Sequence, residues 1–178
     1  AGIVMLLYLT VDPETNENFR IGRILVWLRP EEFADGMGYQ TLQALYAIGS
    51  GGLLGRGLGN SIQKLGSVPE AQNDMIFSII CEEMGAAGAI FLIFLFAMLL
   101  WRLGVAAMHA KDLAGALICC GIMGHLALQV ILNIAVVTNT IPNTGITLPF
   151  ISYGGTSAVF LLGEMGLAMN VGKCDRIN

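Results

Sequence analysis

Three long apolar segments constrain this chain more than any other feature of its sequence. They cover residues 75–101, 113–137 and 153–171. A membrane-spanning helix needs about 20 mainly apolar residues, and the first segment alone would extend roughly 40 Å as a helix. With 55% of its residues hydrophobic and 12% charged, the chain lacks the composition of a globular surface. We therefore predict an all-α, polytopic membrane protein with three spans in this sequence.

The first residues, the charge pattern and the cysteines add to the prediction of a membrane protein. Residues 1–9 are apolar but too few to cross a bilayer, and AGIVMLLYLT has neither the basic region nor the cleavage site of a signal peptide. We interpret them as the end of a transmembrane helix, so that the chain is a C-terminal fragment of a larger protein. No basic tract indicates nucleic-acid binding. No C-x-x-C spacing occurs among the cysteines, which we interpret as small hydrophobic residues: Cys81, Cys119, Cys120 and Cys174.

Basic residues in the short connections predict the orientation. Segments 102–112 and 172–178 each contain two basic residues, whereas segment 138–152 contains none. Because Lys and Arg are enriched on the cytoplasmic side, we expect a cytoplasmic loop at 102–112, a cytoplasmic tail at 172–178 and a short extracytoplasmic loop at 138–152. Residues 10–74 would then form a large extracytoplasmic loop, since long loops cross the membrane largely regardless of charge.

Two features stand out within that large loop. In GYQTLQALYAIGS, apolar residues at helical spacing predict a short re-entrant or interfacial helix beginning near Tyr39. The following stretch, residues 49–66, contains seven glycines and matches no nucleotide-binding pattern. Its glycines permit either close helix packing or close approach of the backbone to a ligand, and the residues alone favour packing.

Asp74 is the first of three acids around the start of the first apolar segment. On local grounds it suits a helix N-cap, because its side chain can accept an otherwise unpaired backbone N–H. The alternative is chemical. A carboxylate at the outer membrane boundary, next to a glycine-rich loop, lies where the polar headgroup of a lipid substrate would be presented, and it could accept a proton there.

Glu82 and Glu83 lie deeper in the same segment. On one continuous helix they would be roughly 12 Å or more from Asp74, which exceeds the spacing of the paired carboxylates in inverting glycosidases and disfavours a hydrolase pair. Acids within a membrane usually face a polar partner or cavity. We favour structural pairing with helices outside this sequence over a direct functional role. Three other polar residues, Asn133, Glu164 and His125, are interpreted as interhelical hydrogen-bonding groups.

Three stretches, in order, resemble one family. They are GYQTLQALYAIGSGGLLGRGLGNSIQKL, PEAQNDMIFSIICEEMG and NTGITLPFISYGGTS. Together they look like the C-terminal half of the SEDS proteins, the FtsW/RodA/SpoVE group, over nearly the whole chain. Many members carry His-Thr before the acid of the second motif, and QND is similar to the SpoVE/FtsW-like branch.

This resemblance implies a ten-helix membrane enzyme that polymerises lipid II into glycan strands. It also implies partnership with a class B penicillin-binding protein and with division or sporulation proteins. The essential acid of the family falls on Asp74, which would take the proton of an acceptor hydroxyl in an inverting glycosyl transfer. The departing diphosphate needs positive charge, from Arg56, Lys64, basic residues elsewhere or a divalent cation.

The resemblance also assigns supporting roles. The residues carried over as substrate-binding or cavity-shaping are Glu70, Gly55, Gly57, Gly59, Ser152, Tyr153, Gly154 and Gly155. Glu82, Glu83 and Pro149 are assigned to structural support, and no residue is assigned to a metal.

Two other functions remain open from the sequence. A flippase or transporter of lipid-linked precursors would need Glu82, Glu83 and Glu164 along a polar pathway more than it would need Asp74. A non-catalytic scaffold of the cell-wall machinery would need none of these acids.

Overall fold

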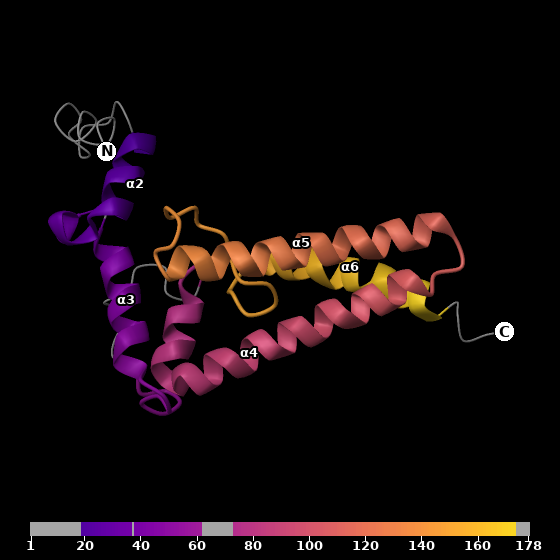
Figure 1. Cartoon of the computed structure of the whole chain (residues 1–178), viewed down its shortest axis with the longest axis horizontal. Helices are drawn as coiled ribbons and strands as arrows, with labels where there is room; N and C mark the ends of the chain where they lie inside the picture. The colour runs from indigo at the N-terminus through magenta and orange to yellow at the C-terminus, as the bar shows by residue number, and fades with distance from the viewer. Residues whose placement is uncertain (1–18, 37, 62–72, 174–178) are drawn as a thin grey trace.

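The computed structural model describes residues 19–36, 38–61 and 73–173, and every regular element in these ranges is helical. The elements are α2 (Phe19–Leu28), the 3₁₀ helix η1 (Pro30–Phe33), α3 (Tyr39–Gly51), α4 (Ile76–Met108), α5 (Leu113–Val137) and α6 (Gly155–Lys173). The long helices α4, α5 and α6 contact one another along an elongated bundle, and α2 and α3 run across one end of it (Figure 1). The predicted all-α class is therefore confirmed.

Two helices, α4 and α5, are long and apolar enough to cross a membrane. Only 11% of the most apolar window of α4 and 28% of that of α5 is buried within the chain, whereas a core helix of a soluble protein is mostly buried. Large apolar side chains such as Phe91 and Trp101 on α4 and Leu128 and Ile131 on α5 are exposed. These faces need lipid or further helices around them.

The short helix predicted near Tyr39 is confirmed as α3. Gly38 precedes it, and Gly52, with a φ of 57°, ends it. Its buried residues include Leu42, Ala44 and Ala47, and this face packs on the first turns of α4. The preceding helix α2 was not foreseen as a separate element within segment 10–74.

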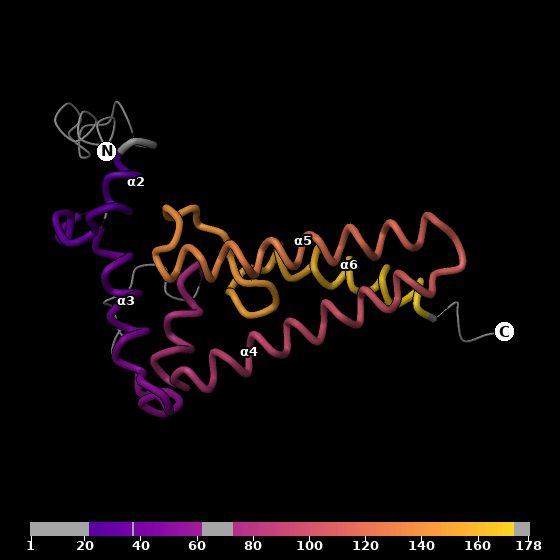
Figure 2. Tube along the Cα trace, viewed as in Figure 1, coloured from indigo at the N-terminus to yellow at the C-terminus, as the bar shows by residue number. Residues whose placement is uncertain are grey.

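The prediction of one continuous helix across 75–101 is wrong, because α4 breaks at Gly85. This glycine has φ 68° and ψ −170°, which no helix contains. The Cα trace turns sharply there, so that residues 76–84 run beside α3 and residues 86–108 return along α5 (Figure 2). All three acids precede the break, so they lie on the short segment beside α3 and not on the long part of α4.

The backbone of residues 52–57 supplies the hydrogen bonds that this break would otherwise leave unmade. Helix ends have N–H and C=O groups without partners in the helix. Here the carbonyls before the break accept, and the N–H groups after it donate. The bonds are Arg56 N to Glu82 O (2.9 Å), Gly57 N to Glu83 O (3.0 Å), Ala86 N to Gly52 O (2.9 Å) and Ala87 N to Leu53 O (3.1 Å).

These hydrogen bonds require the backbone of residues 52–57 to contact the backbone of α4 at Gly85 directly. A Cβ atom at Gly55 would lie 2.2 Å from the carbonyl oxygen of Glu83, and one at Gly85 would lie 2.4 Å from the backbone nitrogen of Gly55. Both glycines also have positive φ. At Gly55 and Gly85, glycine therefore permits close backbone packing, and at Gly55 this agrees with the role that the residues alone favoured for stretch 49–66.

Candidate functional site

Asp74 lies where α3, the start of α4, the end of α5 and the segment before α6 meet. It is 9% exposed, and its Oδ1 accepts a long hydrogen bond of 3.5 Å from Nε2 of Gln40 on α3. The N-cap of α4 is Met75, which makes no side-chain capping hydrogen bond. The carboxylate of Asp74 thus faces α3. Asp74 was considered as the N-cap of this helix, but it lies one residue before the observed N-cap.

The backbone at Asp74 is held by Asn133 of α5. Nδ2 of Asn133 donates to the carbonyl of Asp74 (2.8 Å) and to the carbonyl of Ile146 (2.7 Å). Asn133 is fully buried, where each hydrogen bond is costly to lose. Asn133 was predicted to bond between helices, but it instead joins α5 to two backbone carbonyls outside the helices, one at the acid and one in the loop before α6.

Ser152 holds the residue before the acid. Its hydroxyl donates to the carbonyl of Asn73 and accepts from the backbone N–H of Leu148 at 2.7 Å. Leu148 and Pro149 are fully buried beside it. The structure therefore brings Ser152, which was predicted as a substrate-binding or cavity-shaping residue, to the segment of Asp74, and it buries Pro149, which was predicted as a structural support, next to Leu148.

The rest of the SYGG motif follows Ser152 in the chain. The side chain of Tyr153 is exposed. The carbonyl of Gly154 accepts from Ala158 N at 3.0 Å, and Gly155 is the first residue of α6. Their contribution to substrate binding stays a prediction.

Two residues that sequence reasoning did not assign to the site lead to Asp74, because Gln40 contacts the carboxylate and Asn143 contacts Gln40. Gln40, which donates to the carboxylate, accepts from Nδ2 of Asn143 at 3.2 Å. Oδ1 of Asn143 in turn accepts from the backbone N–H of Gly145 at 3.0 Å. A line of amides thus runs from the loop after α5 to the carboxylate. The only sequence signals were a glutamine off the apolar face of α3 and an asparagine next to a proline.

Arg56 and Glu82 form a second polar cluster, at the opposite end of α3. Gln40 and Gly51 are separated by roughly 16 Å along this helix at about 1.5 Å per residue. Glu82 is fully buried and accepts a hydrogen bond from Ser61, and its Oε1 lies 3.6 Å from Nη1 of Arg56. The expectation that Glu82 pairs with helices outside this sequence is therefore wrong. The structure does not bring Arg56 to Asp74.

The other glycines of the predicted site, Gly55, Gly57 and Gly59, lie in the same loop as Arg56. Glu83 is partly buried and its carbonyl accepts from Gly57. The predicted substrate-binding residues Lys64 and Glu70 fall outside the described residues.

A third polar contact joins α5 to α6. Nδ1 of His125 lies 3.1 Å from Oε2 of Glu164, which confirms the predicted interhelical role of this pair. Within the described ranges, no three His, Cys, Asp or Glu side chains gather as metal ligands. Cys81 and Cys119 are buried and Cys120 is exposed, all as free thiols, while Cys174 is outside the described residues.

Known sequences resemble the chain along most of its length. Stage V sporulation protein E of Bacillus subtilis is 48% identical over 158 residues, which are 89% of this chain and 43% of that protein. The probable peptidoglycan glycosyltransferase FtsW of the same organism is 42% identical over 175 residues, 96% of this chain and 43% of that protein. The chain thus spans under half the length of these relatives.

Solved structures give the same picture. A chain from a structure of a peptidoglycan synthase complex, described as coordinating polymerization and crosslinking, matches 99% of this chain and 48% of its own length at a TM-score of 0.70 and 28% identity. A mutant of the rod shape determining protein RodA from Thermus thermophilus matches with a TM-score of 0.58 and a sequence identity of 26%. The match covers 99% of this chain and 55% of the RodA chain. The family model for the FtsW/RodA/SpoVE cell cycle proteins matches residues 1–177. This chain belongs to the FtsW/RodA/SpoVE family.

Proposed function

We propose that this chain carries the catalytic carboxylate of a peptidoglycan glycosyltransferase that polymerises lipid II. One observation carries the proposal: Asp74 is an almost buried acid whose backbone and side chain are fixed from three directions, by Asn133, Ser152 and Gln40. Preorganised positioning of this kind is what a general base needs. The names of the FtsW relatives support the same activity.

The proposed reaction is an inverting glycosyl transfer. The hydroxyl oxygen of the acceptor sugar attacks the anomeric carbon of a donor sugar linked to a lipid diphosphate. Its proton passes to Asp74 as the new glycosidic bond forms. The bond from the anomeric carbon to the diphosphate breaks, and the lipid diphosphate leaves with the electron pair. One carboxylate suffices because the leaving group departs as an anion.

The leaving diphosphate needs positive charge nearby. Arg56 already faces Glu82, at the far end of α3 from Gln40, and any role toward substrate must compete with that pair. Lys64, basic residues elsewhere in the full-length protein or a divalent cation are the other sources.

We place the full-length protein in the bacterial cell membrane as a multi-pass protein, with Asp74 on the outer side. The apolar faces of α4 and α5 support the membrane location, and the loop charges support the orientation. The match to a peptidoglycan synthase complex supports a class B penicillin-binding protein as partner, within the division or sporulation machinery.

Two assays on one preparation test this function against its rivals. The full-length protein and its partner are placed in liposomes with lipid II, and glycan ladders and the crossing of a fluorescent lipid II are measured. The proposal expects ladders that survive Glu164→Gln, since Glu164 pairs with His125 and not with Asp74. Crossing without ladders would make the protein a flippase. If the protein shows neither ladders nor crossing, the scaffold function is supported.

A further inference from the structure

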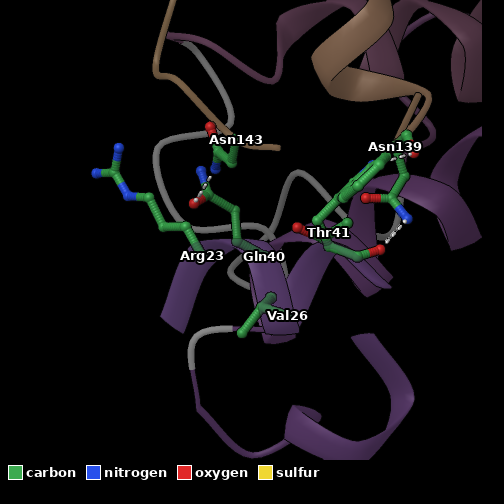
Figure 3. A pocket seen from close by; sticks show the side chains of 7 residues that line it. Arg23, Val26, Gln40, Thr41, Asn139 and Asn143 are labelled. Carbon is green, nitrogen blue, oxygen red and sulfur yellow. Dashed lines mark hydrogen bonds between the residues drawn. The ribbon is translucent and has the colours of Figure 1, made fainter. Parts of the chain in front are cut away.

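A pocket of about 210 Å³ opens beside the proposed base. Arg23, Val26 and Trp27 of α2, Gln40 and Thr41 of α3, and Asn139 and Asn143 of the loop after α5 line it (Figure 3). One wall is locked by a reciprocal pair, because Trp27 Nε1 donates to the carbonyl of Asn139 (2.9 Å) and Asn139 Nδ2 donates to the carbonyl of Trp27 (3.2 Å).

Gln40 connects the pocket to Asp74. Its side chain lines the pocket while its Nε2 donates to Asp74 Oδ1. Figure 3 shows its amide bonded to Asn143, a second lining residue. Asp74 itself is not among the lining residues, so the reacting hydroxyl of a sugar held in the pocket must extend past Gln40 to reach the carboxylate.

The lining chemistry suits a sugar ring. Carboxamides of Gln40 and Asn143 and the hydroxyl of Thr41 can each donate and accept, as sugar hydroxyls and acetamido groups require. The ring of Trp27 and the side chain of Val26 offer apolar surface to the C–H face of a sugar. The volume is below the roughly 300–1,000 Å³ of pockets for drug-sized ligands, which suits a single ring.

The charge pattern disfavours a diphosphate inside the pocket. Among the described residues of the lining, Arg23 alone is basic, and its guanidinium points away from the other labelled side chains in Figure 3. The interior instead presents amide groups, whose oxygens repel an anion. A positive charge at the rim suits an anionic substituent of the sugar that extends outward.

We infer that this pocket is the subsite for the N-acylated amino sugar of the acceptor, with Arg23 meeting an anionic substituent at the rim. The inference rests on the proposed function, because only there is Asp74 the base that faces the acceptor. The acceptor, not the donor, is assigned here because its hydroxyl is the group whose proton Asp74 takes.

Kinetics of the full-length protein with its partner test this assignment, with lipid II as the probe. Arg23→Ala and Thr41→Val should each raise the KM for lipid II about 5- to 10-fold, the loss of about one hydrogen bond, with kcat within about twofold. Arg29→Ala is the matched control: it removes the same charge from a 60% exposed side chain outside the pocket lining, and should leave KM unchanged.

The outcomes separate this inference from the proposed function. If both pocket variants keep the wild-type KM while Asp74→Asn forms no ladders, the pocket is not the acceptor subsite and the glycosyltransferase proposal stands. If Asp74→Asn remains active, the proposed function itself fails. Should Thr41→Val prove unstable, Arg23→Ala decides alone, with its melting temperature measured beside its KM, because Arg23 is exposed but also makes an interaction within the protein.

Discussion

The side-chain amide of Asn133 donates to the backbone carbonyl of Asp74 at 2.8 Å, across 59 positions of sequence. A second hydrogen of the same amide group reaches Ile146. One buried side chain of α5 thus holds both the backbone of Asp74 and the loop at Ile146 in place.

Asn133→Leu should therefore destabilise the protein by about 2–4 kcal/mol and lower glycan synthesis, because two buried carbonyls lose their donor. Thermal unfolding of the full-length protein in detergent measures the first effect. Asn60→Ala is the control, since the side chain of Asn60 is exposed and, among the described residues, makes one long bond of 3.4 Å to the carbonyl of Arg56. Equal melting temperatures for the two variants would contradict the role given to Asn133.

Ser152→Ala should act more on catalysis than on stability. It removes the hydroxyl that bridges Leu148 and Asn73, so the residue before Asp74 is no longer fixed. We expect kcat to fall about 10-fold or more with a stability loss of about 1 kcal/mol. Ser152→Thr keeps the hydroxyl and should restore most of kcat. A variant with normal kcat, or no rescue by Thr, would show that the bridge does not position the acid.

Gly85→Ala should prevent folding or cost more than about 3 kcal/mol, because the added Cβ meets the backbone of residues 53 and 55 and the residue has positive φ. Yield and melting temperature after purification report the result. Gly49→Ala is the matched control, since a Cβ there meets nothing within 4 Å and α3 gains a better helix former. A stable Gly85→Ala protein would mean that the break in α4 is not required.

Arg56→Ala distinguishes a structural from a substrate-binding arginine. Arg56 is 39% exposed, whereas its partner Glu82 is fully buried, so its loss leaves a buried carboxylate with less compensation. We expect a stability loss of about 1–2 kcal/mol with KM and kcat nearly unchanged. An unchanged melting temperature with a large fall in kcat would instead assign Arg56 to the leaving diphosphate.

Local patterns predicted much of this fold and less of the site. Apolar spacing located α3, whereas the choice of Asp74 as the acid came from the family resemblance and stays a prediction. The same patterns missed the break at Gly85, because a lone glycine in an apolar run also suits helix packing. The partners that make the break possible lie some 30 positions earlier, in residues 52–57, where no local pattern connects them to α4.

The site shows the same limit. Asn133 was predicted to bond between helices, but its partner was not, since the carbonyl of Asp74 has no sequence signature. Gln40 and Asn143 were missed because uncharged amides are common on helix surfaces and in loops. Glu82 was expected to pair with a helix outside this sequence, whereas the segment before Gly85 packs against the loop that carries Arg56 and Ser61, and both residues contact Glu82.

The most direct test of the central claim is the initial rate of lipid II polymerisation by the full-length protein with its partner, comparing wild type with Asp74→Asn. The substitution keeps the size of the side chain and its ability to accept from Gln40, but removes the base. We predict a loss of about 100-fold or more at all lipid II concentrations, with unchanged melting temperature and partner binding. A rate within about twofold of wild type would contradict the assignment of Asp74 as the base.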